Sequence, residues 1–177
     1  MATRKCTWIL IGMVVIMTWL LGSVIQAGAE TKEIRIVSQF SRMDILPVGV
    51  VEGHIFYTAE VRGLVLVDGE VAVYVGWAKG EILKGIGPYD GYVKHIHQDG
   101  STIVYKFQAD VKIAPDGKTS LHEDCKGEIT MGTGRFEGIK GSVSYSGKRL
   151  TAISPGLKET RGDMIFEGTM TYTLPSK

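Results

Sequence analysis

Hydrophobic and polar residues alternate over most of the chain after residue 30, with the period of two that is typical of β-strands. The clearest run is Thr102 to Ile113, where every second residue from Ile103 is apolar and the residues between are mostly Lys, Gln and Asp. Similar alternation predicts strands from Glu33 to Phe40, from Ile55 to Val67 and from Met164 to Leu174. The pattern leaves little room for helix and predicts an all-β protein.

Aspartate-glycine pairs separate several of these runs and predict tight hairpin turns. They are Asp68-Gly69, Asp99-Gly100 and Asp116-Gly117. After the first of them, the alternation predicts a return strand that ends near Gly76 to Gly80. Its expected inward-facing residues are Val71, Val73, Val75 and Trp77.

Two segments have a less regular pattern. Residues 41–50 contain Pro47 and Gly49 and are predicted to form a connection. Residues 79–91 are spaced by glycines and are predicted to form a short strand or a long loop. With strands also expected at Tyr92–Gln98, before residue 132 and after residue 138, seven or eight antiparallel strands result. A closed barrel of about eight strands would leave no exposed sheet edge, so a closed antiparallel barrel is the predicted fold.

A glycine-rich motif, GTGRFEGIKGSVSYSG, spans Gly132 to Gly147. Its glycine spacing differs from GxGxxG, and a strand pattern follows it where a dinucleotide-binding loop needs a helix. We therefore interpret it as a strand-turn-strand corner. Within the turn, Phe136 is expected to cap one barrel end and Arg135 to hydrogen-bond turn carbonyls.

This motif, continued by residues 148–151 and by the terminal GTMTYTLPSK, resembles the allene oxide cyclase and dirigent-like β-barrel superfamily, and most closely its small exported bacterial members. The resemblance implies a barrel and a small set of functions, among them a cofactor-free cyclase that holds a reactive unsaturated substrate in one conformation. It also implies a homo-oligomer, since plant relatives assemble as trimers. No catalytic residue of the cyclase has a match in this sequence.

The first 29 residues have the pattern of a secretory signal peptide. Arg4 and Lys5 precede an apolar stretch from Trp8 to Ile25, and small residues precede a cleavage site expected after Ala29. An uncleaved anchor is the alternative, because the apolar stretch lies at the short end of what can span a bilayer. The sequence therefore predicts a signal peptide at 1–29, a single barrel domain at 30–177, and a secreted or periplasmic location.

The charge of the expected mature chain excludes some classes of partner. Cleavage would leave 18 basic and 19 acidic residues, a formal charge of −1. No basic stripe with interleaved aromatic residues is present, so nucleic-acid binding is not predicted. No membrane-surface helix is visible either, so membrane association is not predicted after signal removal.

Cysteine and histidine residues are the candidates for reactive or metal chemistry. Cys125 would be the one mature cysteine, and a buried thiol is favoured over a reactive thiol or an intermolecular bridge. His95 and His97 would share a strand face, but nothing in the spacing brings His122 or Glu123 to them, so no metal is predicted. Such histidines are more often exposed or hydrogen-bonded. No nucleophile or phosphate-binding motif occurs, and no cofactor is predicted.

The expected inward faces are rich in aromatic side chains. These are Tyr57, Trp77, Tyr105, Phe107, Tyr145, Phe166 and Tyr172. The rings either fill the barrel or line a mostly apolar ligand site in which tyrosine hydroxyls orient the ligand. The leading hypothesis is an exported barrel that binds a small apolar or aromatic molecule in its lumen. The alternatives are a cyclase or isomerase and an interaction protein that acts through its outer face.

Overall fold

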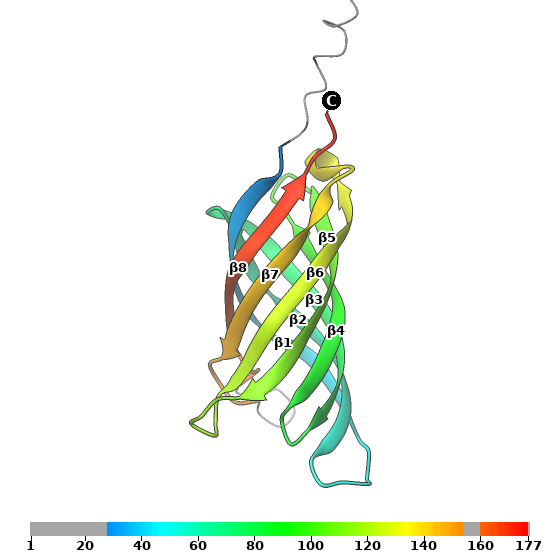
Figure 1. The fold of residues 1–177 in the computed structure, drawn as a ribbon, viewed down its shortest axis with the longest axis vertical. Helices are drawn as coiled ribbons and strands as arrows, with labels where there is room; N and C mark the ends of the chain where they lie inside the picture. Colours follow the sequence, from blue (N-terminus) through cyan, green and yellow to red (C-terminus); the bar gives the residue numbers. More distant parts are fainter. Residues whose placement is uncertain (1–27, 154–159, 177) are drawn as a thin grey trace, which may run out of the picture. The chain divides into compact units, whose positions relative to one another are not determined.

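The described chain forms a closed barrel of eight strands, each antiparallel to its neighbours (Figure 1). The computed structural model describes residues 28–153 and 160–176, and the expected signal peptide lies almost entirely outside them. The strands are β1 (Glu30–Pro47), β2 (His54–Val67), β3 (Glu70–Leu83), β4 (Gly87–Ile96), β5 (Thr102–Ile113), β6 (Ser120–Thr133), β7 (Lys140–Arg149) and β8 (Met164–Thr173). The predicted all-β fold with a closed barrel of about eight strands is confirmed.

Consecutive strands run in opposite directions, so their connections divide between the two barrel ends (Figure 1). One end, which we call the capped end, carries the β2–β3 and β4–β5 turns and the short 3-10 helix η1 (Gly134–Phe136) between β6 and β7. The start of β1 and the end of β8 also lie there, where Glu30 pairs with Tyr172. The opposite end, which we call the loop end, carries the other connections.

The predicted hairpin at Asp68-Gly69 is confirmed. Asp68 and Gly69 both have positive φ, 47° and 83°, as a two-residue turn between twisted strands requires. Val67 pairs with Glu70 directly across this turn. The turn therefore sets the register of β3 on β2.

Strand β1 is longer than its sequence pattern indicates. Residues 41–47, predicted to belong to a connection, continue the strand as far as Pro47. The pairing with β2 shifts between Phe40 and Arg42, so Ser41 is the extra residue of a bulge. The bulge breaks the alternation, and after it Met43 is the residue that packs against the core.

The predicted inward face of β3 is wrong. Val71, Val73 and Trp77 are exposed, at 40%, 44% and 46%, whereas Val75 is buried at 5% but is not part of the core cluster of the interior. Paired residues share a face, and the buried Val65 of β2 pairs with Ala72, so the even-numbered residues of β3 point inward. The inner face of this strand is made of Ala72, Tyr74, Gly76, Ala78, Gly80 and Ile82.

The segment 79–91 is more ordered than expected. β3 continues to Leu83, and β4 begins at Gly87. Lys84 and Gly85 make the turn between them with positive φ, 51° and 84°. The glycines that obscured the pattern thus belong to one tight turn and to the inner face of the strands beside it.

The barrel interior is the hydrophobic core of the described chain. Inward-facing residues of all eight strands, together with Phe136 of η1, form a single buried cluster. The cluster is dominated by aliphatic and aromatic side chains, with buried histidines and serines among them. Any chemistry inside the barrel therefore takes place in a largely apolar environment.

Candidate functional site

The candidate site is the barrel interior, where six of the seven predicted aromatic residues point. Tyr105 is fully buried, and Tyr57 is partly buried and packs against the core. The other four are nearly or fully buried: Phe107, Tyr145, Phe166 and Tyr172. Trp77 is the exception. The even-numbered residues of β3 point inward, so the ring of Trp77 lies on the outer face. The proposed ligand-site role of Trp77 in the lumen is therefore wrong.

Aromatic rings contact one another along the interior in a continuous chain. Successive ring centroids lie 5.3 to 6.4 Å apart, most of them edge to face. In order, the members of this ring chain are Tyr74, His95, Tyr105, Tyr145, Phe166, His122, Tyr89 and Phe107. Tyr172 lies apart from it at the capped end, 6.4 Å from Phe136.

Sequence reasoning missed Tyr74 and Tyr89, which both point inward. Tyr74 was missed because the odd-numbered residues of β3 were predicted to face inward. Tyr89 was missed because it lies in the segment whose glycines suggested a loop. The signal that could have found Tyr74 is the Asp68-Gly69 turn, because a two-residue turn fixes which residues of β2 and β3 share a face. Applied from Val65, that rule places Tyr74 inside.

Three histidines are buried inside the barrel: His95 of β4, His97 directly after β4, and His122 of β6. His95 is fully buried, and His97 and His122 are each 4% exposed. Each has one ring nitrogen near a partner: His95 Nε2 lies 3.4 Å from the Tyr105 hydroxyl, and His122 Nδ1 lies 2.8 Å from that of Tyr89. His97 Nδ1 lies 3.0 Å from a Glu70 carboxylate oxygen.

Burial keeps the central groups neutral at neutral pH. It lowers the pKa of His95 to about 3, and together with the positive charge of Arg149 it lowers the pKa of His122 to about 4. Burial also raises the pKa of the Cys125 thiol to about 11, although the Tyr89 hydroxyl lies 3.7 Å from the sulfur. Cys125 is therefore a buried, protonated thiol, as expected, and is not set up as a nucleophile beside His122.

Several buried polar atoms of the interior have no hydrogen-bond partner among the described residues. They belong to inward-facing side chains and are Ser38 Oγ, His95 Nδ1, His97 Nε2, His122 Nε2 and Arg149 Nε. An unpartnered buried polar group costs about 1 to 3 kcal/mol, and in folded proteins such groups usually bind water, an ion or a ligand. The interior thus offers polar anchor points within an apolar lining.

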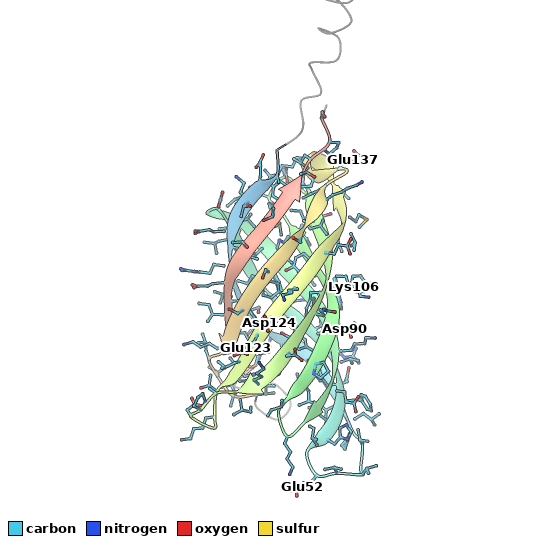
Figure 2. The ribbon with its side chains drawn as sticks, in the orientation of Figure 1. Glu52, Asp90, Lys106, Glu123, Asp124 and Glu137 are labelled. Atoms are coloured by element: carbon cyan, nitrogen blue, oxygen red, sulfur yellow. The ribbon has the colours of Figure 1, made fainter. Side chains whose placement is uncertain are left out.

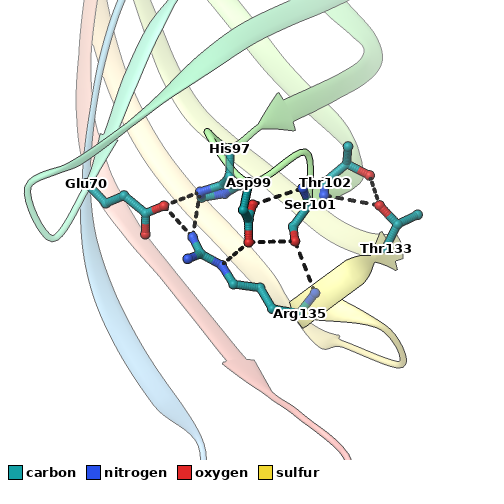
Figure 3. A network of polar contacts seen from close by, with 7 residues as sticks. All are labelled: Glu70, His97, Asp99, Ser101, Thr102, Thr133 and Arg135. Carbon is teal, nitrogen blue, oxygen red and sulfur yellow. Dashed lines mark hydrogen bonds and ion pairs between the residues drawn. The ribbon is translucent and has the colours of Figure 1, made fainter.

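The capped end is closed by a polar network around η1 (Figure 3). Glu70 accepts a hydrogen bond from the Arg135 guanidinium, which also lies 3.7 Å from the Asp99 carboxylate. The backbone N–H of Arg135 donates to Ser101 Oγ at 3.1 Å. His97 Nδ1 lies 2.9 Å from Arg135 Nη2 and 3.0 Å from Glu70, so the ring accepts from the arginine or donates to the carboxylate, according to its tautomer.

This network gives Arg135 and Phe136 the structural roles expected of the glycine motif, with one difference. Phe136 is 7% exposed and its ring centroid lies 4.8 Å from that of His97, so it caps the barrel end as predicted. The Arg135 side chain binds Glu70 and Asp99 rather than turn carbonyls. The guanidinium also lies over the Phe136 ring, 4.8 Å from its centroid.

The outer wall of the barrel is chemically uneven. Val37, Leu64 and Val73 are 44% to 50% exposed and lie side by side on β1, β2 and β3. We call these three residues the outer apolar patch. On β7 the outward residues are instead serine and lysine: Lys140, Ser142, Ser144, Ser146 and Lys148.

A groove of about 700 Å³ lies on the side of the barrel that carries the outer apolar patch, and its lining residues belong to β1 to β5. Trp77 and Tyr92 pair across β3 and β4 in this groove and are about half exposed. Outward-pointing charged residues, including Asp90 and Lys106, border it (Figure 2). Trp77 thus belongs to the outer surface together with Tyr92.

Comparison with known proteins adds no functional assignment: the chain matches no family model and no curated protein. Across residues 28–153 and 160–176, no helix is long and apolar enough to span a membrane. In the same part of the chain, no group of three or more His, Cys, Asp or Glu side chains is placed to hold a metal ion. The functional argument therefore depends on the barrel itself.

Proposed function

We propose that this barrel binds a small apolar or aromatic molecule among its inward-facing rings, without a cofactor. The observation that carries the proposal is the set of unpartnered buried atoms on inward-facing side chains, above all His95 Nδ1 and His122 Nε2. Both atoms belong to rings of the aromatic ring chain, so a bound molecule would meet apolar surface and hydrogen-bonding groups together. Tyr105, in contact with His95, would help to orient it.

The proposal also includes export of the barrel and its relation to a known superfamily. Removal of a signal peptide after Ala29 would deliver the barrel to the periplasm or the cell exterior. The resemblance of the Gly132–Gly147 motif to the allene oxide cyclase and dirigent-like superfamily is consistent with a lumen that holds a small molecule.

Native mass spectrometry of the purified protein tests the proposal, with thermal unfolding in the presence of naphthalene or cinnamamide as a second measurement. We expect a retained small molecule, or a raised melting temperature with one of these neutral probes. Tyr105→Phe removes the hydroxyl near His95 and should weaken binding, whereas Tyr92→Phe removes an exposed outer hydroxyl and should not. A protein with no retained mass and no response to either probe would overturn the proposal.

A second function, self-association through the outer wall, is favoured by a separate observation. The outer apolar patch and the exposed Trp77–Tyr92 pair lie on one half of the barrel. Exposed contiguous apolar surface often marks an interaction site, and tryptophan and tyrosine are enriched among residues that dominate binding energy. We propose a second copy of this chain as the partner.

A further inference from the structure

Arg149, which is partly buried, directs its guanidinium toward the interior at the loop end of the barrel. It is the last residue of β7 and belongs to the inward-facing series that includes Val143, Tyr145 and Gly147. Its guanidinium carbon lies 5.8 Å from the centroid of the Phe40 ring, and its Nε is buried without a hydrogen-bond partner among the described residues. This arginine therefore faces the same apolar interior as the ring chain.

His122 offers a second unpartnered group at the same end. It pairs with Gly147 across β6 and β7, so it lies diagonally next to Arg149 on the inner face. The Tyr89 hydroxyl lies 2.8 Å from His122 Nδ1. When Tyr89 donates to Nδ1, the proton of the neutral ring is on Nε2, which is then a buried donor with no acceptor among the described residues.

The positive charge of Arg149 has no ionic partner within the described residues. Asp163, close to the strand end, is bound to Thr151, whose hydroxyl donates to its carboxylate at 2.6 Å. Because Arg149 is partly buried, its charge has lost part of its hydration without gaining a counterion among the described residues, which is costly. Burial accordingly lowers the pKa of Arg149, yet an arginine stays charged at neutral pH.

One positive charge with neutral donors suits a monoanion better than a phosphate dianion. A planar guanidinium matches the two oxygens of a carboxylate. Burial raises the pKa of Tyr57 above its ordinary value, so its hydroxyl keeps its proton and can also donate. The Phe40 and Phe166 rings beside Arg149 and His122 provide the apolar surface that the rest of such a ligand requires.

We propose that the loop end of the interior binds the carboxylate of a small apolar acid, held by Arg149 and by His122 Nε2. This inference rests on the proposed lumen-binding function and adds the charge of the ligand. The apolar part of the acid lies along the aromatic ring chain, toward the middle of the barrel.

Three probes test the site on the whole purified protein at pH 7. Sodium formate, compared with sodium chloride at equal ionic strength, reports on the carboxylate site through the melting temperature. Cinnamate and its neutral amide, cinnamamide, are compared by calorimetric titration. We expect formate to stabilise the protein more than chloride, and cinnamate to bind about tenfold or more tighter than cinnamamide, as a hydrogen-bonded charge would give.

Variants locate the effect. Arg149→Gln should abolish both preferences, Arg149→Lys should keep part of them, and His122→Phe should weaken them. Lys148→Gln removes the same charge from the adjacent exposed residue and should leave both preferences intact. The lysine variant keeps the test valid if the glutamine variant fails to fold.

The outcomes separate this inference from the function on which it rests. Equal binding of cinnamate and cinnamamide, with no formate preference, would overturn the carboxylate site and leave lumen binding supported. A formate preference that depends on Arg149, without binding of either aromatic probe, would support the carboxylate site and contradict lumen binding. Preferences that survive Arg149→Gln but disappear in Lys148→Gln would assign the effect to the surface and overturn the site.

Discussion

Small residues on the inner face of β3 leave the space that the large rings occupy. A Cβ on Gly80 would lie 2.7 Å from the Tyr57 ring and 2.8 Å from Tyr89 Cβ. A Cβ on Gly76 would lie 3.3 Å from the Tyr74 ring. Because the interior has nearly fixed volume, tyrosines can enter only where a neighbouring strand contributes glycine or alanine. Val71, Val73 and Trp77 of β3 accordingly lie exposed on the outer face.

The buried histidines predict an acid-sensitive barrel. Unfolded, both His95 and His122 have a pKa near 6.5, but folded the values are about 3 and about 4. Between these values the unfolded chain binds protons that the folded chain does not, so stability is full above pH 6.5 and falls as the pH decreases. Each histidine should cost about 1.4 kcal/mol per pH unit in this range.

Urea unfolding at pH 7, 6 and 5 measures this slope. The groups that face the two rings are Tyr74, Tyr105 and His97 around His95, and Tyr89 and Arg149 around His122. The carboxylates with lowered pKa values lose their contribution only below about pH 4.5, outside the measured window. His122→Phe should remove about half of the slope, and an unchanged slope would contradict the assignment.

At the scale of elements, η1 joins two strands and closes a barrel end in a few residues. Its entry residue Gly134 has φ of 62°, and a Cβ there would lie 2.4 Å from Ser101 Oγ. The Ser101 hydroxyl accepts a hydrogen bond from the backbone N–H of Arg135 and donates one to the Asp99 carboxylate. The turn, the β4–β5 hairpin and the polar network are thus one interlocked unit.

Gly134→Ala should therefore destabilise the protein more than Gly117→Ala. Gly117 has a similar φ of 67° but open space around it. An alanine there should therefore lower the stability only by the free energy of holding alanine in the left-handed conformation, about 1 kcal/mol. The clash with Ser101 should add about 1 to 2 kcal/mol at Gly134, and Gly134→Val should abolish soluble folding. Chemical denaturation compares the variants. Equal costs for the two alanines, or no partial rescue by Ser101→Ala, would show that the clash is absent.

Arg135→Ala tests the network from its charged side. Arg135 and Glu70 are each 43% exposed, so solvent screens their attraction and the loss should be about 1 kcal/mol or less. Arg35→Ala breaks a more exposed pair with Glu167, at 2.8 Å, and should cost less. Urea unfolding measures both variants, and native mass spectrometry measures ligand retention. Full stability combined with lost ligand would show that Arg135 has a binding role instead of a structural one.

At the scale of the whole barrel, the outer wall carries an apolar patch among charged residues on one side and a row of serines on another. Val37, Leu64 and Val73 form the patch on β1, β2 and β3, and the serines lie on β7. Nothing inside the barrel requires this difference, because outward residues do not pack in the core. It is the feature expected of a surface that contacts another molecule.

Replacing two residues of the outer apolar patch should weaken self-association without unfolding the barrel. Leu64→Thr with Val73→Thr makes the patch polar with threonine, a β-branched residue that suits strands. Both positions are about half exposed, so stability should change by about 1 kcal/mol or less. Sedimentation velocity over a concentration series measures the oligomer. Ser142→Thr with Ser144→Thr on β7 is the control. A wild-type protein that stays monomeric throughout would contradict the outer-wall function.

Local patterns predicted much of the strand order, because alternation and Asp-Gly turns act within a few residues. The β5 and β8 faces and the Asp68-Gly69 hairpin followed directly from them. Where a bulge at Ser41 or a glycine on an inner face interrupted the alternation, the prediction failed at β1 and β3. A bulge or an inner-face glycine depends on packing against the neighbouring strands, so the sequence of a single strand does not reveal it.

The sequence by itself determined the all-β class, the closed barrel, the capping role of Phe136 and the inward direction of most aromatic residues, since each follows from local periodicity and turn chemistry. Only the tertiary structure decided that Trp77 faces outward and that Tyr74 and Tyr89 face inward, because the volume of a closed interior is shared among strands. The same holds for the meeting of Arg149 and His122 at the loop end. Which residues of β6 and β7 lie next to each other depends on the register of the two strands, and register is a property of the whole barrel.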